Sequence, residues 1–283
     1  MAFFRALEDA RPPERRLFAD PFARSFLPAG LARVVRAARF PIVADAVTRF
    51  VDRRWPGART SAVARTRFID EALGAELRNV KQVVLLGAGF DARAYRLDGM
   101  KGCRVFEVDH PATLAKKRAS VARSGAQSGH VTFVPTDFNE RAIADVMADA
   151  GFDRTAPTFV VWEGVTNYLD EAGVDATLGW CGTAAPGSMV LFTYVHAGVI
   201  RNPRDFHGTE NLFATLAAAG ESWTFGIDPG EIGQFVAARG LALERDLGAA
   251  EYRALVYGAE AAKMRGYEFY RIAACRVVPS RRA

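Results

Sequence analysis

The hydrophobic pattern of the chain changes near residue 80. Before that point, apolar residues recur at three- and four-residue spacing over residues 41–55 and 62–77, which is typical of amphipathic helices. The first stretch ends at Pro56 and Gly57. Its expected apolar stripe consists of Ile42, Val43, Ala46, Val47, Phe50 and Val51. The pattern predicts a helical N-terminal region over residues 1–79.

After residue 80, short apolar runs alternate with helical stretches. The runs that fit buried strands lie at residues 83–86, 104–109, 131–135, 158–162 and 189–195. Helical stretches between them include residues 111–123 and 139–150. Repeated strand–helix units indicate a mostly parallel sheet covered on both faces. Two late strand candidates, residues 241–245 and 269–277, predict a closing hairpin. We therefore expect an α/β, Rossmann-like core over residues 80–283.

Composition argues against several classes of protein. Half of the 283 residues are hydrophobic, but no apolar run approaches the roughly 20 residues that cross a bilayer. The N-terminus lacks the basic-then-apolar order of a signal peptide. Cys103, Cys181 and Cys275 are scattered, and the four histidines lack ligand spacing, so we expect neither a disulfide framework nor a metal site. We expect a cytoplasmic protein with no membrane partner.

The positive charge of the chain is uneven. The whole chain carries a formal net charge of +5, whereas residues 1–60 hold twelve Arg, no Lys and six Asp or Glu, a net of +6. Such a basic front is compatible with an acidic substrate or with RNA. It is also typical of solvated helix faces in an Arg-rich protein. Because the chain has only five Lys, we favour the second interpretation.

A glycine-rich loop follows the first predicted strand. The sequence Gly87-Ala88-Gly89-Phe90-Asp91-Ala92 fits the G-x-G-x-x-G/A pattern, in which Gly87 and Gly89 let the backbone approach a ligand closely. Asp109 ends the next strand, 22 residues beyond Gly87, where a carboxylate can bind the hydroxyls of an adenosine ribose. Glu107 is the alternative for that role. The pattern predicts a nucleoside cofactor without distinguishing NAD from S-adenosylmethionine.

Acidic residues near the strand ends favour a positively charged cofactor. Asp91 lies inside the loop, where it would repel a diphosphate but suit a sulfonium or ammonium group. Asp137 and Phe138 follow the third strand and could bind and stack on an adenine. Glu163 ends the fourth strand. Because ligands of open α/β sheets bind along the carboxyl edge, this row favours S-adenosylmethionine over NAD.

Several motifs together resemble the leucine carboxyl methyltransferase family. The motifs span residues 86–97, residues 106–111, Glu163-Gly164-Val165 with Tyr168-Leu169, and, near the N-terminus, residues 20–23 and 64–70. The likeness extends over residues 5–195 and is loose beyond them. It implies a class I methyltransferase core with a mostly parallel seven-stranded sheet. It also implies an N-terminal helical lid over residues 1–79 and a second lid segment over residues 196–228.

The resemblance also implies roles for single residues. Arg65 would pair with the carboxylate of the methionine part of S-adenosylmethionine, with Arg67 as its competitor. Gly87 would contact the same part, and Glu163 would face its amino end. Asp109 would hold the ribose, and Asp137 with Phe138 the adenine. Arg15 matches only loosely a position where family members place a basic residue on the cofactor.

The acceptor of the methyl group is less well defined by the sequence. We expect a small molecule that offers a carboxylate or an acidic phenol, positioned by Tyr168 and Tyr194. The candidates for an apolar pocket are Phe206, Phe213, Trp223 and Phe225, and those for a basic contact are Arg15, Arg16 and Arg24. His196 is the one candidate base. The alternatives are an RNA-modifying or RNA-binding protein and an NAD-dependent oxidoreductase; we favour a small-molecule partner over nucleic acid.

Overall fold

A seven-stranded sheet forms the centre of the computed structural model, which describes residues 1–137 and 141–279. The strands are β1 (Gln82–Leu86), β2 (Arg104–Asp109), β3 (Val131–Pro135), β4 (Thr158–Trp162), β5 (Met189–Val195), β6 (Leu241–Gly248) and β7 (Tyr270–Val277). Their spatial order is β3-β2-β1-β4-β5-β7-β6. Strands β1 to β5 run parallel, whereas β7 is antiparallel to both β5 and β6. The predicted α/β fold with a closing hairpin is confirmed.

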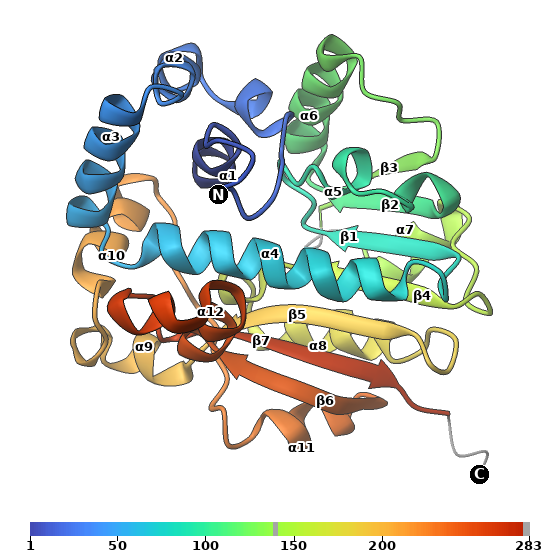
Figure 1. Cartoon of the computed structure of the whole chain (residues 1–283). Helices are drawn as coiled ribbons and strands as arrows, with labels where there is room; N and C mark the ends of the chain where they lie inside the picture. The colour runs from blue at the N-terminus through green and yellow to red at the C-terminus, as the bar shows by residue number, and fades with distance from the viewer. Residues whose placement is uncertain (138–140, 280–283) are drawn as a thin grey trace.

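Helices cover both faces of this sheet. The longer ones are α1 (Ala2–Asp9), α2 (Ala29–Ala37), α3 (Pro41–Arg54), α4 (Ala58–Glu76), α6 (Pro111–Ser124), α8 (Glu171–Cys181), α10 (Thr209–Ala218) and α12 (Ala249–Tyr257). Shorter ones are α5 (Arg93–Arg96), α7 (Ile143–Asp149), α9 (Ala197–Arg201) and α11 (Ile232–Ala237). Figure 1 shows α4 and α12 lying across the near face of the sheet. Among the described residues, no helix is long and apolar enough to cross a bilayer.

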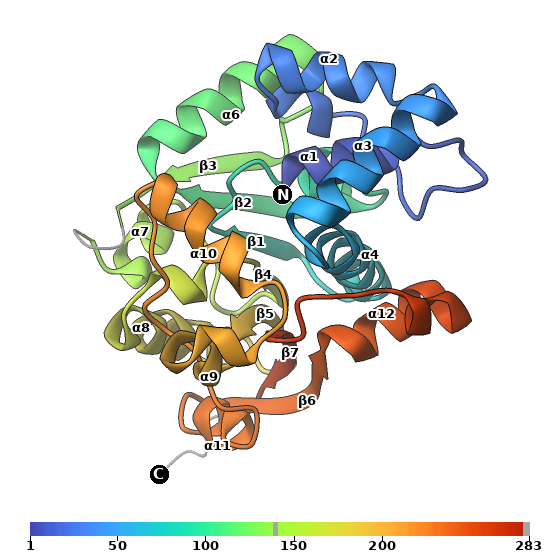
Figure 2. The ribbon, with the colours of Figure 1, turned by 90° about the vertical axis from the view of Figure 1, so that its left-hand side faces the viewer.

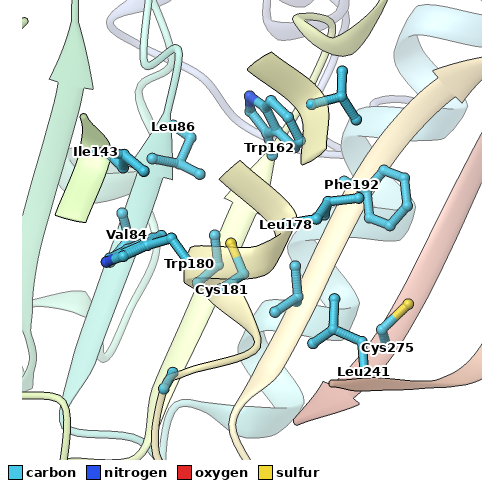
Figure 3. Packing of buried hydrophobic residues seen from close by; sticks show 14 of the residues in the cluster. Val84, Leu86, Ile143, Trp162, Leu178, Trp180, Cys181, Phe192, Leu241 and Cys275 are labelled. Atoms are coloured by element: carbon cyan, nitrogen blue, oxygen red, sulfur yellow. The ribbon is translucent and has the colours of Figure 1, made fainter. Parts of the chain in front are cut away.

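The two faces of the sheet bury separate hydrophobic clusters because strand side chains alternate. Val83 and Leu85 of β1 pack against α4, whereas Val84 and Leu86 face α7 and α8. Figure 3 shows the second cluster, in which Trp162 of β4 lies among side chains of neighbouring strands and of α8. All five residues of β1 are buried, as expected of a central strand covered on both faces.

The strand register brings several chain segments to one edge of the sheet. Leu86 at the end of β1 pairs with Val108 of β2 and with Trp162 of β4. The loops after these three strands therefore leave the sheet side by side. The chain order reverses between β1 and β4, which is the position where open α/β sheets bind ligands.

Helices α1, α2 and α3 stand beyond this edge, apart from the sheet (Figure 2). In contrast, α4 contributes Ile69 and Leu73 to the cluster on the sheet. The apolar stripe expected in α3 divides in two. Val51 is buried and Val43 and Val47 are half-buried, but Ile42, Ala46 and Phe50 face solvent, because a helix on the periphery of the molecule has only one inner face.

The segment between β5 and β6 contains α9, α10 and α11. Three of its aromatic residues, Phe206, Phe213 and Trp223, pack with Phe269 and Tyr270 at the start of β7. The indole N–H of Trp55, which follows α3, donates to the hydroxyl oxygen of Thr215 in α10 at 3.0 Å. This contact joins the N-terminal helices to the segment 196–228. The assignment of residues 1–79 and 196–228 as lids stays a prediction.

Candidate functional site

The glycine loop after β1 is held tightly against the ends of its neighbours. Gly87 has φ +61°, and a side chain there would collide with the Val165 side chain after β4. Gly89 has φ +41°, and its backbone N–H donates to Asp109 Oδ2 at 2.5 Å. Positive φ angles are readily adopted only by glycine. The local sequence therefore brings the β1 loop, the β2 end and the β4 end into contact.

A cavity of about 200 Å³ lies over this loop. Its walls are the loop residues 87–91, the ends of β1 and β4 with Glu163 and Gly164, Arg65 of α4, and Met1, Ala2 and Arg5 at the start of the chain. Three of the residues expected to bind a cofactor besides the glycines thus line one cavity: Arg65, Asp91 and Glu163. Asp109 borders the cavity through its hydrogen bond to Gly89.

Asp109, and not Glu107, is the acidic residue available at the end of β2. Both oxygens of Asp109 accept backbone N–H groups, from Gly89 at 2.5 Å and from His110 at 2.6 Å. Its side chain remains partly exposed. The Glu107 carboxyl is fully buried beneath the loop, 2.9 Å from Lys117 Nζ, and burial raises its pKa. This geometry favours Asp109 over Glu107 for the predicted ribose role, which stays a prediction.

The structure describes only one of the two residues predicted to bind the adenine. Asp137 follows β3 at the same edge of the sheet, two residues after Pro135, which pairs with Asp109. Phe138 lies outside the described residues. The roles of Asp137 and Phe138 stay predictions.

Arg65, which the sequence favours over Arg67, lines the cavity, whereas Arg67 does not. Arg65 Nε lies 2.8 Å from Glu163 Oε1, and its guanidinium carbon lies 4.6 Å from the centre of the Tyr270 ring. Arg67 points away from the cavity, toward Glu71 at 2.6 Å. The side chain of Arg65 is buried, whereas that of Arg67 is two-fifths exposed.

A buried network of alternating charges extends from Arg65. Glu163 also contacts Arg93 Nη1 at 2.8 Å, and Arg93 reaches Asp70 at 2.8 Å and Asp91 at 2.6 Å. Asp70 also pairs with Arg96. Arg96 and Arg5 both pair with Asp20. Four arginines thus meet four carboxylates, and the network joins α1 to the end of β4.

The sequence predicted a row of acidic residues near the strand ends. In the structure, two of them, Asp91 and Glu163, are paired with arginines. Burial by itself would raise the pKa of Asp91, but the charge of Arg93 outweighs it and holds that pKa below its usual range. For Glu163, Arg93 and Arg65 likewise overcome burial and lower the pKa to about 2. Both carboxylates are ionised at neutral pH, and their charge is compensated by the arginines. Repulsion between Asp91 and a diphosphate is therefore weaker than the sequence suggested.

Two residues of the site escaped the sequence reasoning. Arg5 lines the cavity, contacts Asp20 at 2.9 Å and donates to the backbone oxygen of Phe90. Arg93 is the centre of the charge network. The position of Arg93 directly after the loop was a signal that could have identified it. The position of Arg5 was not readable, because its partners are 15 and 85 residues away.

The three N-terminal arginines considered for the acceptor do not line the cavity over the glycine loop. Arg16 lies 3.6 Å from Asp9, and Arg24 is exposed. Arg15 lines a separate cavity of about 500 Å³ between α1, α3, α4 and α12. Helix α1 separates the two cavities, with Arg5 on one side and Phe4 and Leu7 on the other.

The two tyrosines expected to position the acceptor have different surroundings. Tyr168 follows β4 in a single helical turn (Thr166–Tyr168) and is 40% exposed. Tyr194 is buried in β5, where its hydroxyl donates to Asp246 at 2.9 Å and accepts from Arg271 at 3.1 Å. Neither lines the cofactor cavity. Of the two tyrosines, only Tyr168 is exposed, and its hydroxyl lies beside Trp223 and Glu221.

The aromatic residues of the segment 196–228 do not form one open pocket. Trp223 packs edge-on against Phe213, Phe269 and Tyr270, with ring centres 5.3 to 5.9 Å apart. Phe206 contacts the same cluster, whereas Phe225 belongs to the main core with Phe235. His196 caps α9 by accepting the N–H of Gly198 at 2.9 Å, with Asp228 3.7 Å away.

The described residues contain no group of three or more His, Cys, Asp or Glu that could hold a metal ion. Chemically, the cavity combines a close-approach backbone loop, the neighbouring Asp109 carboxylate and a buried Arg–Glu pair. These groups fit a zwitterionic amino-acid moiety joined to a nucleoside, because Arg65 can meet a carboxylate, Glu163 an ammonium group and Asp109 two hydroxyls.

Comparison with known proteins agrees with this geometry. The model of a family described as leucine carboxyl methyltransferase matches residues 1–182. A protein of Streptomyces coelicolor is 38% identical over 203 residues, which cover 71% of this chain and 69% of the relative. A protein of Frankia alni is 39% identical over 209 residues, covering 72% and 70%. Both are named as candidate S-adenosyl-L-methionine-dependent methyltransferases.

Solved structures share the fold at low sequence identity. A candidate methyltransferase from Thermobifida fusca is similar with a TM-score of 0.60 and 18% identity, covering 84% of this chain and 89% of its own. A protein of the DUF574 family from Streptomyces avermitilis is similar with a TM-score of 0.60 and 14% identity, covering 98% and 97%. These similarities show the fold alone.

Proposed function

This chain belongs to the leucine carboxyl methyltransferase family and is an S-adenosylmethionine-dependent methyltransferase, and on that premise we propose that it methylates an acidic oxygen of a small molecule. The acceptor would be a carboxylate or an acidic phenol, and the product an ester or an ether. The earlier alternative of an NAD-dependent oxidoreductase is set aside by the family.

The residues of the cavity suit S-adenosylmethionine. Arg65 would meet its carboxylate, Glu163 its amino group and Asp109 its ribose hydroxyls, with Gly87 and Gly89 allowing close backbone approach. When bound, this cofactor supplies a methyl group from its sulfonium. Transfer of the methyl group converts the sulfonium into a neutral thioether. The protein then needs little acid catalysis. Its task is to hold the acceptor oxygen in line and to exclude water.

The observation that supports an acidic acceptor is the state of Glu163. Its two carboxylate oxygens are held by Arg65 and Arg93 at 2.8 Å each, and its pKa is lowered to about 2. A carboxylate held in this way is a poor general base. His196, the other candidate, caps α9 next to Asp228. An acceptor that is already ionised needs no base, which favours a carboxylate or an acidic phenol over an alcohol or an amine.

Tyr168 is the residue we assign to the acceptor. It ends the short helical turn directly after the Glu163-Gly164-Val165 segment, and its side chain is 40% exposed. Its hydroxyl lies beside Trp223 and Glu221, which are partners that an acceptor could replace, and a phenol hydroxyl can donate to an anionic oxygen. Tyr194 is left to a structural role, since its hydroxyl is already bonded to Asp246 and Arg271.

A panel of acceptors with labelled S-adenosylmethionine tests the proposal. The panel should pair each carboxylic acid with its amide, and each acidic phenol with the corresponding alcohol. We expect label in base-labile esters or in aryl ethers, and none in the matched amides and alcohols. Label that enters only amines, thiols or RNA would exclude an oxygen acceptor, while leaving the methyltransferase assignment intact.

A further inference from the structure

Helices α2 and α3 form a hairpin over residues 29–54 that projects from the rest of the molecule. Its inner side is anchored, because Val35, Ala38 and Val47 pack against Ala6 and Leu7 of α1. Figures 1 and 2 both place α2 and α3 at the periphery, away from the sheet. We call this segment the α2–α3 hairpin.

The outer side of the α2–α3 hairpin carries an unusual share of exposed apolar side chains. Ile42 is 83% exposed, Phe50 66% and Phe40 56%. Five of the large hydrophobic side chains exposed among the described residues belong to the hairpin: Leu31, Val34, Phe40, Ile42 and Phe50. A soluble surface rarely gathers such side chains without a partner.

The α2–α3 hairpin is also strongly basic. Exposed arginines in the hairpin are Arg33, Arg36, Arg39, Arg49, Arg53 and Arg54. The part of the chain that the structure describes offers none of them a carboxylate within ion-pairing distance. Only Asp45 and Asp52 are acidic within residues 29–54, and Asp52 pairs with Arg59 at 2.7 Å. Six arginines against two acids leave a net charge of +4.

The two kinds of side chain are interleaved along one side of α3. Ile42, Ala46, Arg49, Phe50 and Arg53 recur at three- and four-residue spacing, and all five are exposed. An arginine beside a bulky apolar residue can extend its guanidinium toward an anion while the apolar side chain enters a nonpolar phase. This arrangement is typical of a helix that lies in a membrane interface.

Other occupants fit this pattern less well. A second copy bound face to face would bring six arginines against six. The central part of a protein–protein interface is depleted of charged residues, whereas Arg49 and Arg53 here lie within the apolar stripe. A nucleic acid would satisfy the arginines but leave Ile42 and Phe50 in water.

We propose that the outer side of the α2–α3 hairpin binds the surface of an anionic lipid bilayer, with Phe40, Ile42 and Phe50 entering the interface and the arginines binding lipid phosphates. The sequence led us to expect no membrane partner, but that expectation rested on the lack of a spanning segment, which a surface attachment does not require. The inference goes beyond the proposed function and does not depend on the identity of the acceptor.

Vesicle co-sedimentation of the full chain tests this inference. We expect the wild type to sediment with vesicles rich in phosphatidylglycerol, and neither with phosphatidylcholine vesicles nor with phosphatidylglycerol vesicles at high salt. The double variant Ile42→Ser/Phe50→Ser should lower the partition coefficient about tenfold or more. The double variant Arg49→Gln/Arg53→Gln should lower it by a similar factor.

Matched variants elsewhere on the surface provide the controls. Leu255→Ser in α12 replaces an apolar residue that is 58% exposed, and Arg78→Gln with Arg204→Gln removes two exposed arginines. These variants should partition like the wild type. All variants should keep the wild-type melting temperature and affinity for S-adenosylhomocysteine, because the replaced side chains are exposed and lie outside the cofactor cavity.

Several outcomes would overturn the inference. The wild type could fail to bind phosphatidylglycerol vesicles, or all variants could bind equally. Self-association that is lost in Ile42→Ser/Phe50→Ser would identify a subunit interface in place of a lipid surface. Retention on polyglutamate or on single-stranded RNA, without binding to vesicles, would assign the hairpin to an acidic protein or to a nucleic acid.

Discussion

At the scale of single residues, Glu163 joins two arginines from distant parts of the chain. Arg65 comes from α4 and Arg93 from the start of α5, and both lie 2.8 Å from the Glu163 carboxylate. Such a buried group is held by its partners, so removing one charge leaves the others uncompensated. The ion pair therefore contributes both to stability and to the shape of the cofactor cavity.

We predict that Glu163→Gln lowers the free energy of unfolding at neutral pH by about 3 kcal/mol. The pKa of Glu163 lies at about 2 in the folded protein, below its ordinary value of 4.5. Its contribution is therefore fully present at neutral pH and is lost as the pH falls from about 4.5 toward about 2. Denaturant unfolding across this range should show the wild type and the variant converging at the acid end.

Glu71→Gln is the matched control for that experiment. Glu71 belongs to an exposed pair with Arg67, so its removal should change the stability by less than about 0.5 kcal/mol at every pH. A constant difference between Glu163→Gln and the wild type down to pH 2 would contradict the proposed role of the charge network.

Some residues of the candidate site could be predicted from the sequence and others could not, for a physical reason. Asp109 and Glu163 were found because strand ends are readable from the apolar runs that precede them. The sequence favoured Asp109 over Glu107, although both lie on the same side of β2. The structure adds that Glu107 is buried against Lys117. Arg5 was missed because its contacts depend on how α1 lies over the loop, which no local pattern encodes.

At the scale of elements, the strands were the most predictable part. The runs predicted at 104–109, 131–135, 158–162 and 189–195 match β2, β3, β4 and β5 residue for residue. A strand covered on both faces is mostly apolar, as β4 and β5 are, which makes it visible in the sequence. Helix α3 was predicted over its correct length, but not which half of its stripe is buried, because that depends on what lies beside it.

The glycine loop should respond to a single added methyl group. Gly87→Ala imposes a positive φ on alanine and drives its Cβ into Val165, so we predict a loss of stability of about 2–4 kcal/mol. Gly125→Ala, at φ +70° with open space around it, should cost only about 1 kcal/mol. Thermal or denaturant unfolding measures the difference.

The double variant Gly87→Ala/Val165→Ala separates strain from collision. It should recover part of the loss of Gly87→Ala, because the smaller side chain at 165 relieves the collision but not the strain in φ. If Gly87→Ala and Gly125→Ala were equally stable, the close contact between the loop and the β4 end would be wrong.

The hydroxyls of the two tyrosines belong to different elements and should have different effects. Tyr168→Phe, at the turn after β4, should raise the KM for the acceptor or lower kcat about tenfold or more, since a hydrogen bond to an anion contributes about 1.5–3 kcal/mol. Tyr194→Phe should lower the stability by about 1 kcal/mol and leave turnover unchanged, because its hydroxyl serves Asp246 and Arg271. A larger loss of turnover in Tyr194→Phe than in Tyr168→Phe would instead support the role of Tyr194 in positioning the acceptor.

At the scale of the whole molecule, the arginines of residues 1–60 divide into a paired group and an exposed group. Arg5, Arg11, Arg16 and Arg59 meet carboxylates within the N-terminal region. The exposed arginines of the α2–α3 hairpin remain unpaired among the described residues, so the net positive charge of the first sixty residues is concentrated there. Composition indicates an excess of positive charge in residues 1–60. The fold shows that most of the exposed part of this charge lies in the α2–α3 hairpin.

Catalysis should not require a divalent metal. Methyl transfer from a sulfonium to an ionised oxygen needs no Lewis acid, and the described residues contain no metal-binding cluster. Turnover in a chelating buffer should therefore equal turnover in untreated buffer. Loss of activity on chelation that magnesium or zinc restores would contradict this prediction.

The most direct test of the account is a calorimetric titration of S-adenosylhomocysteine into the wild type and the Asp109→Ala variant. We predict binding by the wild type and affinity at least about tenfold weaker in the variant, since each lost hydrogen bond to the Asp109 carboxylate contributes about 1.5–3 kcal/mol. Asp98→Ala, which removes an exposed carboxylate outside the cavity, should bind like the wild type. Equal affinity in the wild type and Asp109→Ala, or binding of NAD in place of S-adenosylhomocysteine, would contradict the assignment of the cavity.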